Sequence, residues 1–279
     1  MKSYRDEAWE ANERGRIGEE RFRREYGCEF LIYDETLVNT LKLSELEGIN
    51  PILHVGQTRW YKKPTKDGIY LVSLDPSLGT GGNSAGLQVF ELPSFTQVAE
   101  WHHNLTPIQG QIRILKEVLT YLEDCVGSAP GTLYWSIENN NIGEAGLICI
   151  NDIGEEHFPG MFLSEPMRKG HIRKFRKGFN TTHKTKISAA ARLKQLIESD
   201  RLKIHSKALI SELKSYIAIG VTFKAKSGGE DDLVSALLLI IRMSQVLADW
   251  DPRVFESFSS NADLDDDYEM PMPIFISST

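Results

Sequence analysis

The sequence predicts an α/β fold in which a mixed sheet, an antiparallel meander plus parallel strands, is flanked by helices. An apolar run over 69–75 is stopped by a loop that contains Pro and Gly, which is typical of a buried strand. A helix-spaced apolar pattern then leads to a second such run over 132–138. Because a strand, a crossover helix and a following strand favour parallel pairing, these two runs are expected to lie side by side.

The meander is expected to comprise strands at 69–75, 86–92 and 97–102, with Pro93-Ser94 as the turn between the last two. The next helix should begin at Thr106-Pro107, with Thr as the N-cap and Pro at the first helical position. Its apolar residues fall on one helical face: Ile108, Ile112, Leu115, Leu119 and Leu122.

The rest of the chain carries weaker patterns. The elements expected there are a strand at 27–33, a short helix and a loop within 35–56, a loop or hairpin at 157–167, a helix at 187–199, a strand at 202–204, a short helix at 207–213, an extended segment at 215–223 and a final helix from Asp231-Asp232 to about Trp250. The final helix is apolar nearly all round, so we expect it to be buried.

Composition is that of an ordinary globular protein of 279 residues, with 41% apolar and 25% charged residues. This length accommodates one large domain with extensions. We expect a lead-in segment over 1–66, a main domain over 67–250 and an acidic tail over 251–279. The absence of an apolar stretch of about 18 residues argues against a membrane span, and the polar N-terminus argues for an intracellular protein. Three scattered cysteines without CxxC spacing predict thiols, with neither a disulfide nor a zinc framework.

Charge is unevenly distributed along the chain, although the net charge is −7. Residues 167–192 contain no acidic residue, and aromatic and polar side chains are interleaved with their cations. A charge run is usually a solvated face, but this combination favours contact with the phosphates of nucleic acid. The cations expected to contact DNA are Arg168, Lys169, Arg173, Lys174, Arg176, Lys177, Lys184 and Lys186.

Carboxylates stand at the ends of three predicted core elements. Asp75 ends the first strand, Glu138 ends the strand over 132–138, and Asp231-Asp232 open the final helix. Each could simply start a turn, face solvent or cap a helix. If they converge, however, hard oxygen ligands of this kind suit Mg²⁺ or Mn²⁺. Two such ions, about 3.5–4 Å apart, support phosphodiester hydrolysis.

The same segments allow other interpretations. The loop Gly79-Thr80-Gly81-Gly82 after Asp75 could wrap a phosphate, as in actin-like ATPases, but no second loop of that kind occurs. No Walker loop is present either, so a Walker ATPase is not supported. The pair His102-His103 has no Cys or carboxylate at metal-ligand spacing in the sequence, which favours core or surface histidines.

In order and spacing, five short stretches of the chain resemble the C-terminal nuclease domain of the large terminase subunit of tailed phages, the DNA-packaging motor protein. They lie at 22–30, 71–75 and 134–140, at 178–182 with Lys184 and Lys186, and at 230–237. The resemblance spans residues 20–245. It implies a ribonuclease H-like fold, Mg²⁺ or Mn²⁺ as cofactors, and cleavage of concatemeric phage DNA at the start and end of packaging.

The resemblance also assigns residues and partners. An Asp on the first strand, an Asp or Glu on the fourth and an Asp at the last helix map onto Asp75, Glu138 and Asp232 or its neighbour. The His that often precedes the final Asp pair is Glu230 here, which puts the role of that His in doubt. The implied partners are double-stranded DNA, the motor ATPase domain, the small terminase subunit and the portal, in the host-cell cytoplasm. The ATPase domain is not found in this sequence, so the chain resembles an excised nuclease domain with its linker.

The hypothesis is therefore a metal-dependent DNA endonuclease domain. Asp75 would bridge two ions, Glu138 and Asp232 would complete the ligand set, and Asn140 would orient a ligand. Asp232 is expected to face the strand ends, and Asp231 to cap the helix or act as an outer ligand. Two alternatives stay open, a non-catalytic DNA- or motor-docking module of the same fold and an actin-like ATP-binding domain.

Overall fold

A computed structural model describes residues 7–17, 36–66, 68–167, 174–220, 222–249 and 251. Its centre is a seven-stranded mixed sheet in the order β1-β2-β5-β4-β3-β6-β7. The strands are β1 (Leu53–Val55), β2 (Thr58–Trp60), β3 (Ile69–Asp75), β4 (Ala85–Leu92), β5 (Thr96–His103), β6 (Leu133–Ile137) and β7 (Met161–Phe162). The antiparallel meander β3-β4-β5 and the parallel pairing of β3 with β6 confirm the predicted fold class.

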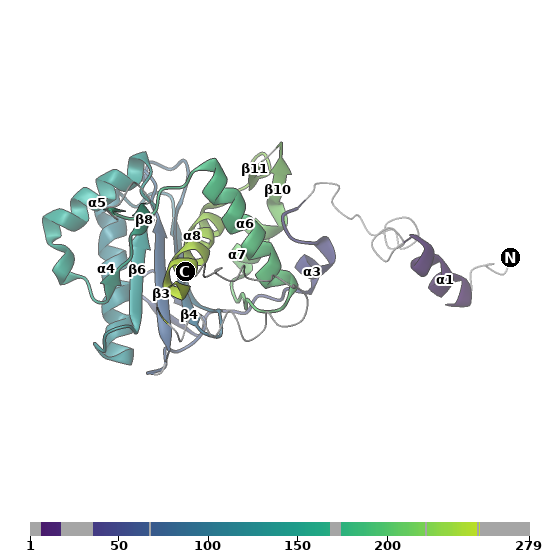
Figure 1. The fold of residues 1–279 in the computed structure, drawn as a ribbon, viewed down its shortest axis with the longest axis horizontal. Coiled ribbons are helices and arrows are strands. Elements are labelled where there is room, and N and C mark those ends of the chain that lie inside the picture. Colours follow the sequence, from purple (N-terminus) through teal and green to yellow (C-terminus); the bar gives the residue numbers. More distant parts are fainter. Residues whose placement is uncertain are drawn as a thin grey trace, which may run out of the picture.

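Helices cover both faces of this sheet (Figure 1). One face carries α4 (Ile108–Val126) and α5 (Asn141–Ile153), and the other carries α6 (His183–Glu198), α7 (Lys207–Ser215) and α8 (Asp232–Ala248). The remaining elements are α1 (Glu7–Ile17), α3 (Thr40–Glu45), a short 3₁₀ turn (Glu155–His157) and two hairpins, β8 (Glu165–Met167) with β9 (Lys174–Arg176) and β10 (Tyr216–Ile219) with β11 (Thr222–Ala225). No described helix combines the length and hydropathy that crossing a bilayer requires.

The side-chain alternation of β3 divides the core into two. Tyr70, Val72 and Leu74 pack with α4, whereas Ile69 and Leu71 pack with α6, α7 and α8. Successive strand residues point to opposite faces of a sheet, so each residue of β3 is assigned to one core. We call the side covered by α8 the α8 face. Burial of α8 is as predicted, since nearly every apolar residue of this helix is inaccessible to solvent.

Small side chains let α8 lie close to the sheet. The Ser73 Oγ donates a hydrogen bond to the Ala236 carbonyl at 2.7 Å. Ser73 pairs with Ser136 across the parallel β3–β6 ladder, and the Ser136 Oγ donates a hydrogen bond to the Leu163 carbonyl at 2.8 Å. Both hydroxyls are thus buried with a hydrogen-bond partner, as buried polar groups require. The N-terminal half of α8 is fixed to the centre of the sheet by this contact.

Residues 36–66, which belong to the expected lead-in segment, contribute to the sheet and to the core. They supply β1 and β2, which extend the sheet beyond β5. Leu37, Val38 and Leu43 are buried with α6, α7 and α8. Residues 36–66 therefore share the sheet and the core on the α8 face with residues 68–249. The expected strand at 27–33 and most of the acidic tail lie outside the described residues.

Three local expectations were wrong. The segment 202–204 forms no strand, because Lys203 makes only a single bridge, to Thr96 at the start of β5. The helix α4 begins at Ile108 with Pro107 as its N-cap residue, and the Thr106 hydroxyl instead hydrogen bonds to the His103 Nδ1 at 2.7 Å. The helix α6 begins at His183, four residues earlier than expected, with Thr182 in a capping box.

The helix α5 was not expected, because its two glycines lower helix propensity. The structure explains both glycines by close approach to β6. A Cβ at Gly143 would lie 1.8 Å from the Glu138 carbonyl oxygen, and one at Gly146 would lie 2.6 Å from the Ile137 side chain. The glycines thus allow α5 to pack directly over the end of β6.

A candidate metal centre at the start of the last helix

The centre lies on one transverse row of the sheet. Asp75 on β3 pairs with Gly86 on β4, and Gly86 pairs with His102 on β5. Asp75 is two residues after Ser73, and Glu138 is two residues after Ser136, so strand alternation places both carboxylates on the α8 face. The sheet therefore directs Asp75, Glu138 and His102 toward the same helix.

Gly86 allows the first turn of α8 to contact this row. A Cβ at position 86 would lie 2.5 Å from the Asp232 carbonyl oxygen and 2.8 Å from its carbonyl carbon. Both are backbone atoms, which cannot move without displacing the helix. Any side chain at this position would therefore separate Asp232 from the row of strand residues.

A cavity of about 780 Å³ opens beside this row. Among its described lining residues, five carboxylates face one ammonium group: Asp75, Glu138, Glu144, Asp231 and Asp232 against Lys186. Asn139, Asn140, Asn180 and Thr181 add further oxygen donors. The sequence prediction that Asp75, Glu138, Asp231 and Asp232 lie close together agrees with this geometry, because all four line one cavity.

Asp75 is the most strongly perturbed acid of the group. Burial is the main reason that the pKa of Asp75 lies well above its usual value, and the neighbouring carboxyl of Glu138 raises it further by charge and by a hydrogen bond. Asp232 and Asp231 add smaller contributions of the same sign. Carboxyl groups crowded in this way resist simultaneous ionisation unless a cation compensates their charge.

Asp231 and Asp232 face different neighbours. The Oδ2 of Asp232 accepts a hydrogen bond from the Ser84 backbone N–H at 3.3 Å, which ties it to the start of β4. Asp231 is the N-cap residue of α8, but its side chain makes no capping hydrogen bond. Its Oδ2 instead accepts from the Ala225 N–H at 3.3 Å and lies 3.8 Å from the Lys186 Nζ. Asp231 thus connects α8 to β11 and α6.

His102, expected to be a core or surface histidine, lies among three carboxylates. Its Nε2 lies 3.6 Å from a Glu230 carboxylate oxygen, 3.7 Å from Asp232 and 3.9 Å from Glu212. Burial lowers the pKa of His102, but the three carboxylates outweigh burial, and the net shift is upward. Sequence spacing could not reveal this cluster, because at least 110 residues separate His102 from each carboxylate.

Glu212 supports the cluster from behind. Its side chain is buried on α7, and its Oε2 accepts a hydrogen bond from the Val234 backbone N–H at 3.0 Å. It therefore satisfies one of the open N–H groups at the first turn of α8, a role more often taken by a residue of the same helix. Burial raises the pKa of Glu212 to about 8.

The predicted DNA-contacting cations are only partly described. Arg168, Lys169 and Arg173 lie outside the described residues, and Lys174 and Arg176 lie on β9, with side chains that are not described. Lys177 is exposed and pairs with Glu155 at 3.1 Å, and Lys184 is exposed at the start of α6. Of the described cations in this set, Lys186 is the one that lines the cavity.

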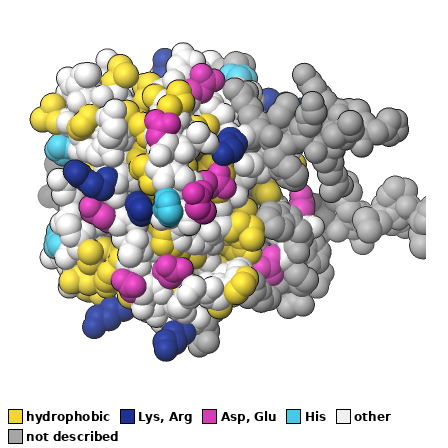
Figure 2. Space-filling model, turned by 90° about the vertical axis from the view of Figure 1, so that its left-hand side faces the viewer, with side chains coloured by type: hydrophobic (Ala, Val, Ile, Leu, Met, Phe, Trp, Pro, Cys, Tyr) yellow, Lys and Arg dark blue, Asp and Glu magenta, His cyan; other side chains and the backbone are white. Residues whose placement is uncertain are grey.

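We call residues 167–192 the basic segment. The surface seen in Figure 2 differs from it in its distribution of charge. Lys, Arg, Asp, Glu and apolar side chains are interspersed there, over the side of the molecule that carries α4 and α5. Among the described residues on this side, no gathering of one charge stands out. The described surface over α4 and α5 therefore shows no second cluster of cations comparable to the basic segment.

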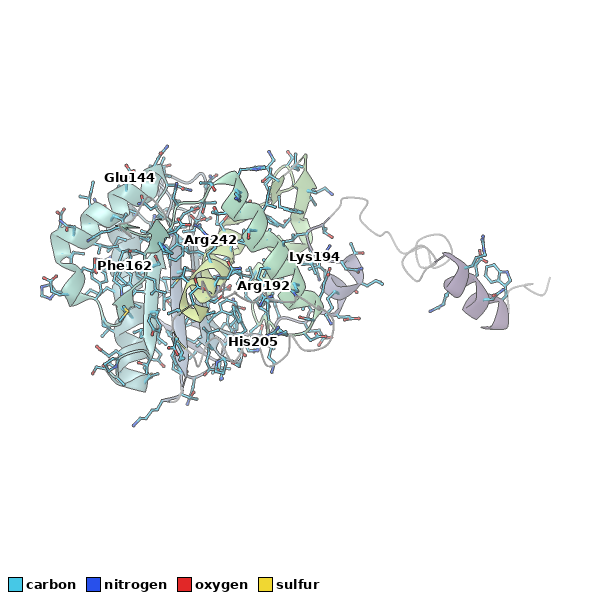
Figure 3. The ribbon with its side chains drawn as sticks, in the orientation of Figure 1. Glu144, Phe162, Arg192, Lys194, His205 and Arg242 are labelled. Carbon is cyan, nitrogen blue, oxygen red and sulfur yellow. The ribbon has the colours of Figure 1, made fainter. Side chains whose placement is uncertain are left out.

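Arg242 fixes the segment that follows β9, and sequence patterns did not single it out. This buried residue of α8 lies near the centre of the body (Figure 3). Its guanidinium donates to the Asn180 carbonyl at 3.0 Å, to the Thr181 hydroxyl at 3.2 Å and to Glu165 at 2.8 Å. It also stacks over the Phe179 ring at 5.1 Å. Two polar residues of the cavity wall are thereby anchored to α8.

The fold and the carboxylate-lined cavity define a ribonuclease H-like α/β protein. A family model described as "Terminase RNaseH-like domain" matches residues 72–244, which is more than half of the chain. The chain therefore belongs to the family of terminase RNaseH-like domains.

Two solved forms of one terminase nuclease agree with this chain at the level of the fold. The large terminase nuclease from thermophilic phage G20c with bound cobalt matches with a TM-score of 0.53 and 16% identity, over 75% of this chain and 97% of that one. The magnesium-bound form of the same nuclease matches with the same values. The human cytomegalovirus terminase nuclease domain, Mn-soaked and inhibitor-bound, has a TM-score of 0.48 at 14% identity, over 78% of this chain and 97% of that one.

Proposed function

We propose that this chain is a metal-dependent DNA endonuclease that cuts concatemeric viral DNA during genome packaging. The observation that carries the proposal is the convergence of Asp75, Glu138, Asp231 and Asp232 on one cavity. Membership of the terminase RNaseH-like family supports the same assignment.

The donor set of this cavity fits divalent cations. Five carboxylates against one lysine leave a strong negative charge. The pKa of Asp75 is raised mainly by burial and further by the neighbouring carboxyl groups, and a bound cation would compensate both effects. Hard oxygen donors of this kind match Mg²⁺ and Mn²⁺. When bound, two such ions acidify the attacking water and stabilise the leaving oxygen of a phosphodiester.

Each residue would have a distinct task in this reaction. Asp75, on the central strand, would hold both ions, and Glu138 and Asp232 would each hold one from either side. Asp231 would act as an outer ligand while it keeps α8 joined to β11 through Ala225. Lys186 would contact a phosphate oxygen of the DNA, and Asn140, which lines the cavity, would orient a ligand.

The basic segment would lead DNA to the cavity. Phosphate contacts from Arg168, Lys169, Arg173, Lys174, Arg176, Lys177 and Lys184 would hold the backbone without reading sequence. Double-stranded DNA is the proposed substrate. The motor ATPase domain, the small terminase subunit and the portal are the proposed partners, in the host-cell cytoplasm. Residues 1–66 are the proposed lead-in, 67–250 the nuclease domain and 251–279 the tail.

The direct test is a plasmid-nicking assay with purified protein. Supercoiled plasmid should be nicked and linearised in Mg²⁺ or Mn²⁺ and left intact in EDTA, because the carboxylates alone cannot activate water. Asp75→Asn protein, purified in the same way, provides the control for contaminating nuclease. Binding of DNA without cleavage under every metal condition would favour a docking module in place of an enzyme.

Charge reversal of the basic segment tests the proposed path of the DNA. Replacing Arg173, Lys174, Arg176 and Lys177 by Glu should weaken binding of a catalytically inactive chain to duplex DNA. The slope of log K against log salt should become shallower by up to about 3 to 4, since each phosphate contact contributes about 0.9. Filter binding over a range of NaCl concentrations measures this slope.

A second charge reversal of equal size provides the control for net charge. Lys63, Lys66, Arg113 and Lys116 lie away from the basic segment, in the loop before β3 and on α4. Replacing these four by Glu should leave the slope nearly unchanged. Equal slopes for the two variants would show that the basic segment is an ordinary solvated face.

A further inference from the structure

We propose that His102, Glu230 and Asp232 form a position for one divalent cation that shares Asp232 with the Asp75–Glu138 pair. The cation class is a borderline metal such as Mn²⁺, Co²⁺ or Zn²⁺. This position adds an imidazole to a centre that sequence patterns described with carboxylates alone. It concerns which ions the chain binds, and it does not depend on whether the chain cuts DNA.

The distances in this cluster fit a shared cation better than direct contact. One ligand atom from each of the three residues lies within 4.8 Å of the other two. The His102 Nε2 lies 3.6 Å from Glu230 and 3.7 Å from Asp232, beyond ordinary hydrogen-bond length. Ligands held about 2.1 Å from an octahedral cation are about 3 Å apart when adjacent and about 4.2 Å apart when opposite. The two distances from the His102 Nε2 fall between these values.

The imidazole nitrogen at the centre of the cluster lies within ion-pair distance of three carboxylates but has no hydrogen-bond partner among the described residues. Among the described residues, the His102 Nε2 is buried and makes no hydrogen bond. Leaving a buried polar atom without a partner costs free energy, so such atoms usually mark a bound water, ion or ligand. Here the atom faces carboxylate oxygens, which do not donate a proton when ionised. A cation satisfies the nitrogen and the oxygens at once.

The surrounding structure holds the three ligands in place. His102 is fixed at the end of β5 by its ladder pairing with Gly86, and Asp232 is tied to Ser84. Buried Glu212 stands 3.9 Å from the same nitrogen while its other oxygen caps α8. Glu230, by contrast, is 54% exposed, which opens the position to solvent and gives an ion access.

The imidazole determines which metals are preferred. Nitrogen ligands suit Mn²⁺, Co²⁺ and Zn²⁺ and raise affinity in that general order, whereas Mg²⁺ prefers oxygen and retains its waters. The alternative reading of the cluster is a plain ion pair, in which a protonated His102 neutralises the carboxylates. The two readings differ in whether the imidazole nitrogen touches a metal.

Pulsed electron paramagnetic resonance of bound Mn²⁺ distinguishes the two readings. The full chain, without DNA, should show ¹⁴N coupling to Mn²⁺ from a directly bound imidazole. The coupling should disappear in His102→Asn and persist in His103→Asn, since His103 lies on the same strand but points to the opposite face. Calorimetric titration should show affinity for Mn²⁺ or Co²⁺ falling at least about tenfold in His102→Asn, with Mg²⁺ affinity nearly unchanged.

Two further variants serve as controls. Glu230→Gln tests the position in a protein that stays folded, and Asp75→Asn tests whether the imidazole binds an ion of the Asp75–Glu138 pair. Glu230→Gln alters an exposed side chain, so the protein should stay folded, keep the ¹⁴N coupling and bind Mn²⁺ more weakly. Asp75→Asn should retain the coupling, because the position does not use Asp75. Absence of ¹⁴N coupling in the unmodified chain, or its persistence in folded His102→Asn, would overturn the proposal. Loss of coupling in Asp75→Asn would show that the imidazole binds an ion of the Asp75–Glu138 pair.

Since no DNA is present, the outcome is separate from the nuclease assignment. A chain that shows the ¹⁴N coupling but never cuts plasmid would retain the cation position and lose the enzyme proposal. A chain that cuts plasmid without the coupling would do the reverse.

Discussion

Replacement of Asp75 by Asn is expected to reduce DNA cleavage about a thousandfold or more. Asn preserves the shape of the side chain but removes the charge that would hold two ions at the centre of the cavity. The initial rate of plasmid nicking at saturating Mg²⁺ or Mn²⁺ measures the effect. Asp124→Asn, an exposed carboxylate on α4, is the matched control and should cut at the normal rate. Undiminished cutting by folded Asp75→Asn would refute the site.

The same variant has an expected effect on stability that needs no catalysis. The pKa of Asp75 is raised in the folded chain, so its ionisation disfavours folding as pH rises above the unfolded value of about 3.8. The contribution of Asp75 to the free energy of unfolding is therefore fully present at low pH. It declines as pH rises toward the pKa of Asp75 in the folded chain. In EDTA at neutral pH, Asp75→Asn should therefore melt at the same temperature as the unmodified chain or higher. A clear loss of thermal stability would contradict the crowding of carboxylates.

Replacement of Gly86 by Ala is expected to disable the site without removing any ligand. The added methyl would overlap the carbonyl of Asp232, so the first turn of α8 must lift from the sheet. Overpacking of this kind costs about 1–3 kcal/mol in the free energy of unfolding. Cleavage should fall as well, because Asp232 would no longer lie beside the row of Asp75 and His102. Urea unfolding and plasmid nicking, measured on one preparation, test both effects.

Gly82→Ala is the matched control for this substitution. Gly82 also lines the cavity, but a Cβ there would meet no atom within 4 Å. Its stability should change by no more than about 0.5 kcal/mol, with cleavage intact. If Gly86→Ala were as stable and as active as Gly82→Ala, the close seating of α8 on β4 would be wrong.

Much of this architecture is readable from local patterns in the chain. The runs at 69–75 and 132–138 are buried strands, their connection through α4 dictates parallel pairing, and the apolar surface of α8 requires burial. Carboxylates at the ends of these elements then converge because the strand ends share an edge. Local pattern and tertiary position agree at these places, so the predicted fold class is confirmed, whereas the ligand roles of the carboxylates stay a prediction.

The features that local patterns miss depend on tertiary contact. The register of β3, β4 and β5 places His102 on the same row as Asp75, two strands away. The carboxylate of Glu230 that it approaches lies more than 100 residues later in the sequence. The glycines of α5 lower its helix propensity, and only contact with Glu138 and Ile137 explains them. The segment around Lys203 was predicted to be a strand, but it forms only a single β-bridge, with Thr96. In each case the structure depends on a contact with a residue outside the local sequence pattern.

The balance of five carboxylates against one lysine has a consequence for the order in which the site assembles. Phosphate groups of DNA are repelled by an uncompensated acidic cavity, most strongly when the cavity is partly closed to water. On the proposed function, divalent cations would have to enter before the potential at the strand ends favoured a phosphodiester. Divalent ions would thus act as a precondition for engagement of the substrate as well as for its hydrolysis. The basic segment could hold DNA beside the cavity all the while, so that loading of ions, and not arrival of DNA, sets the moment of cutting.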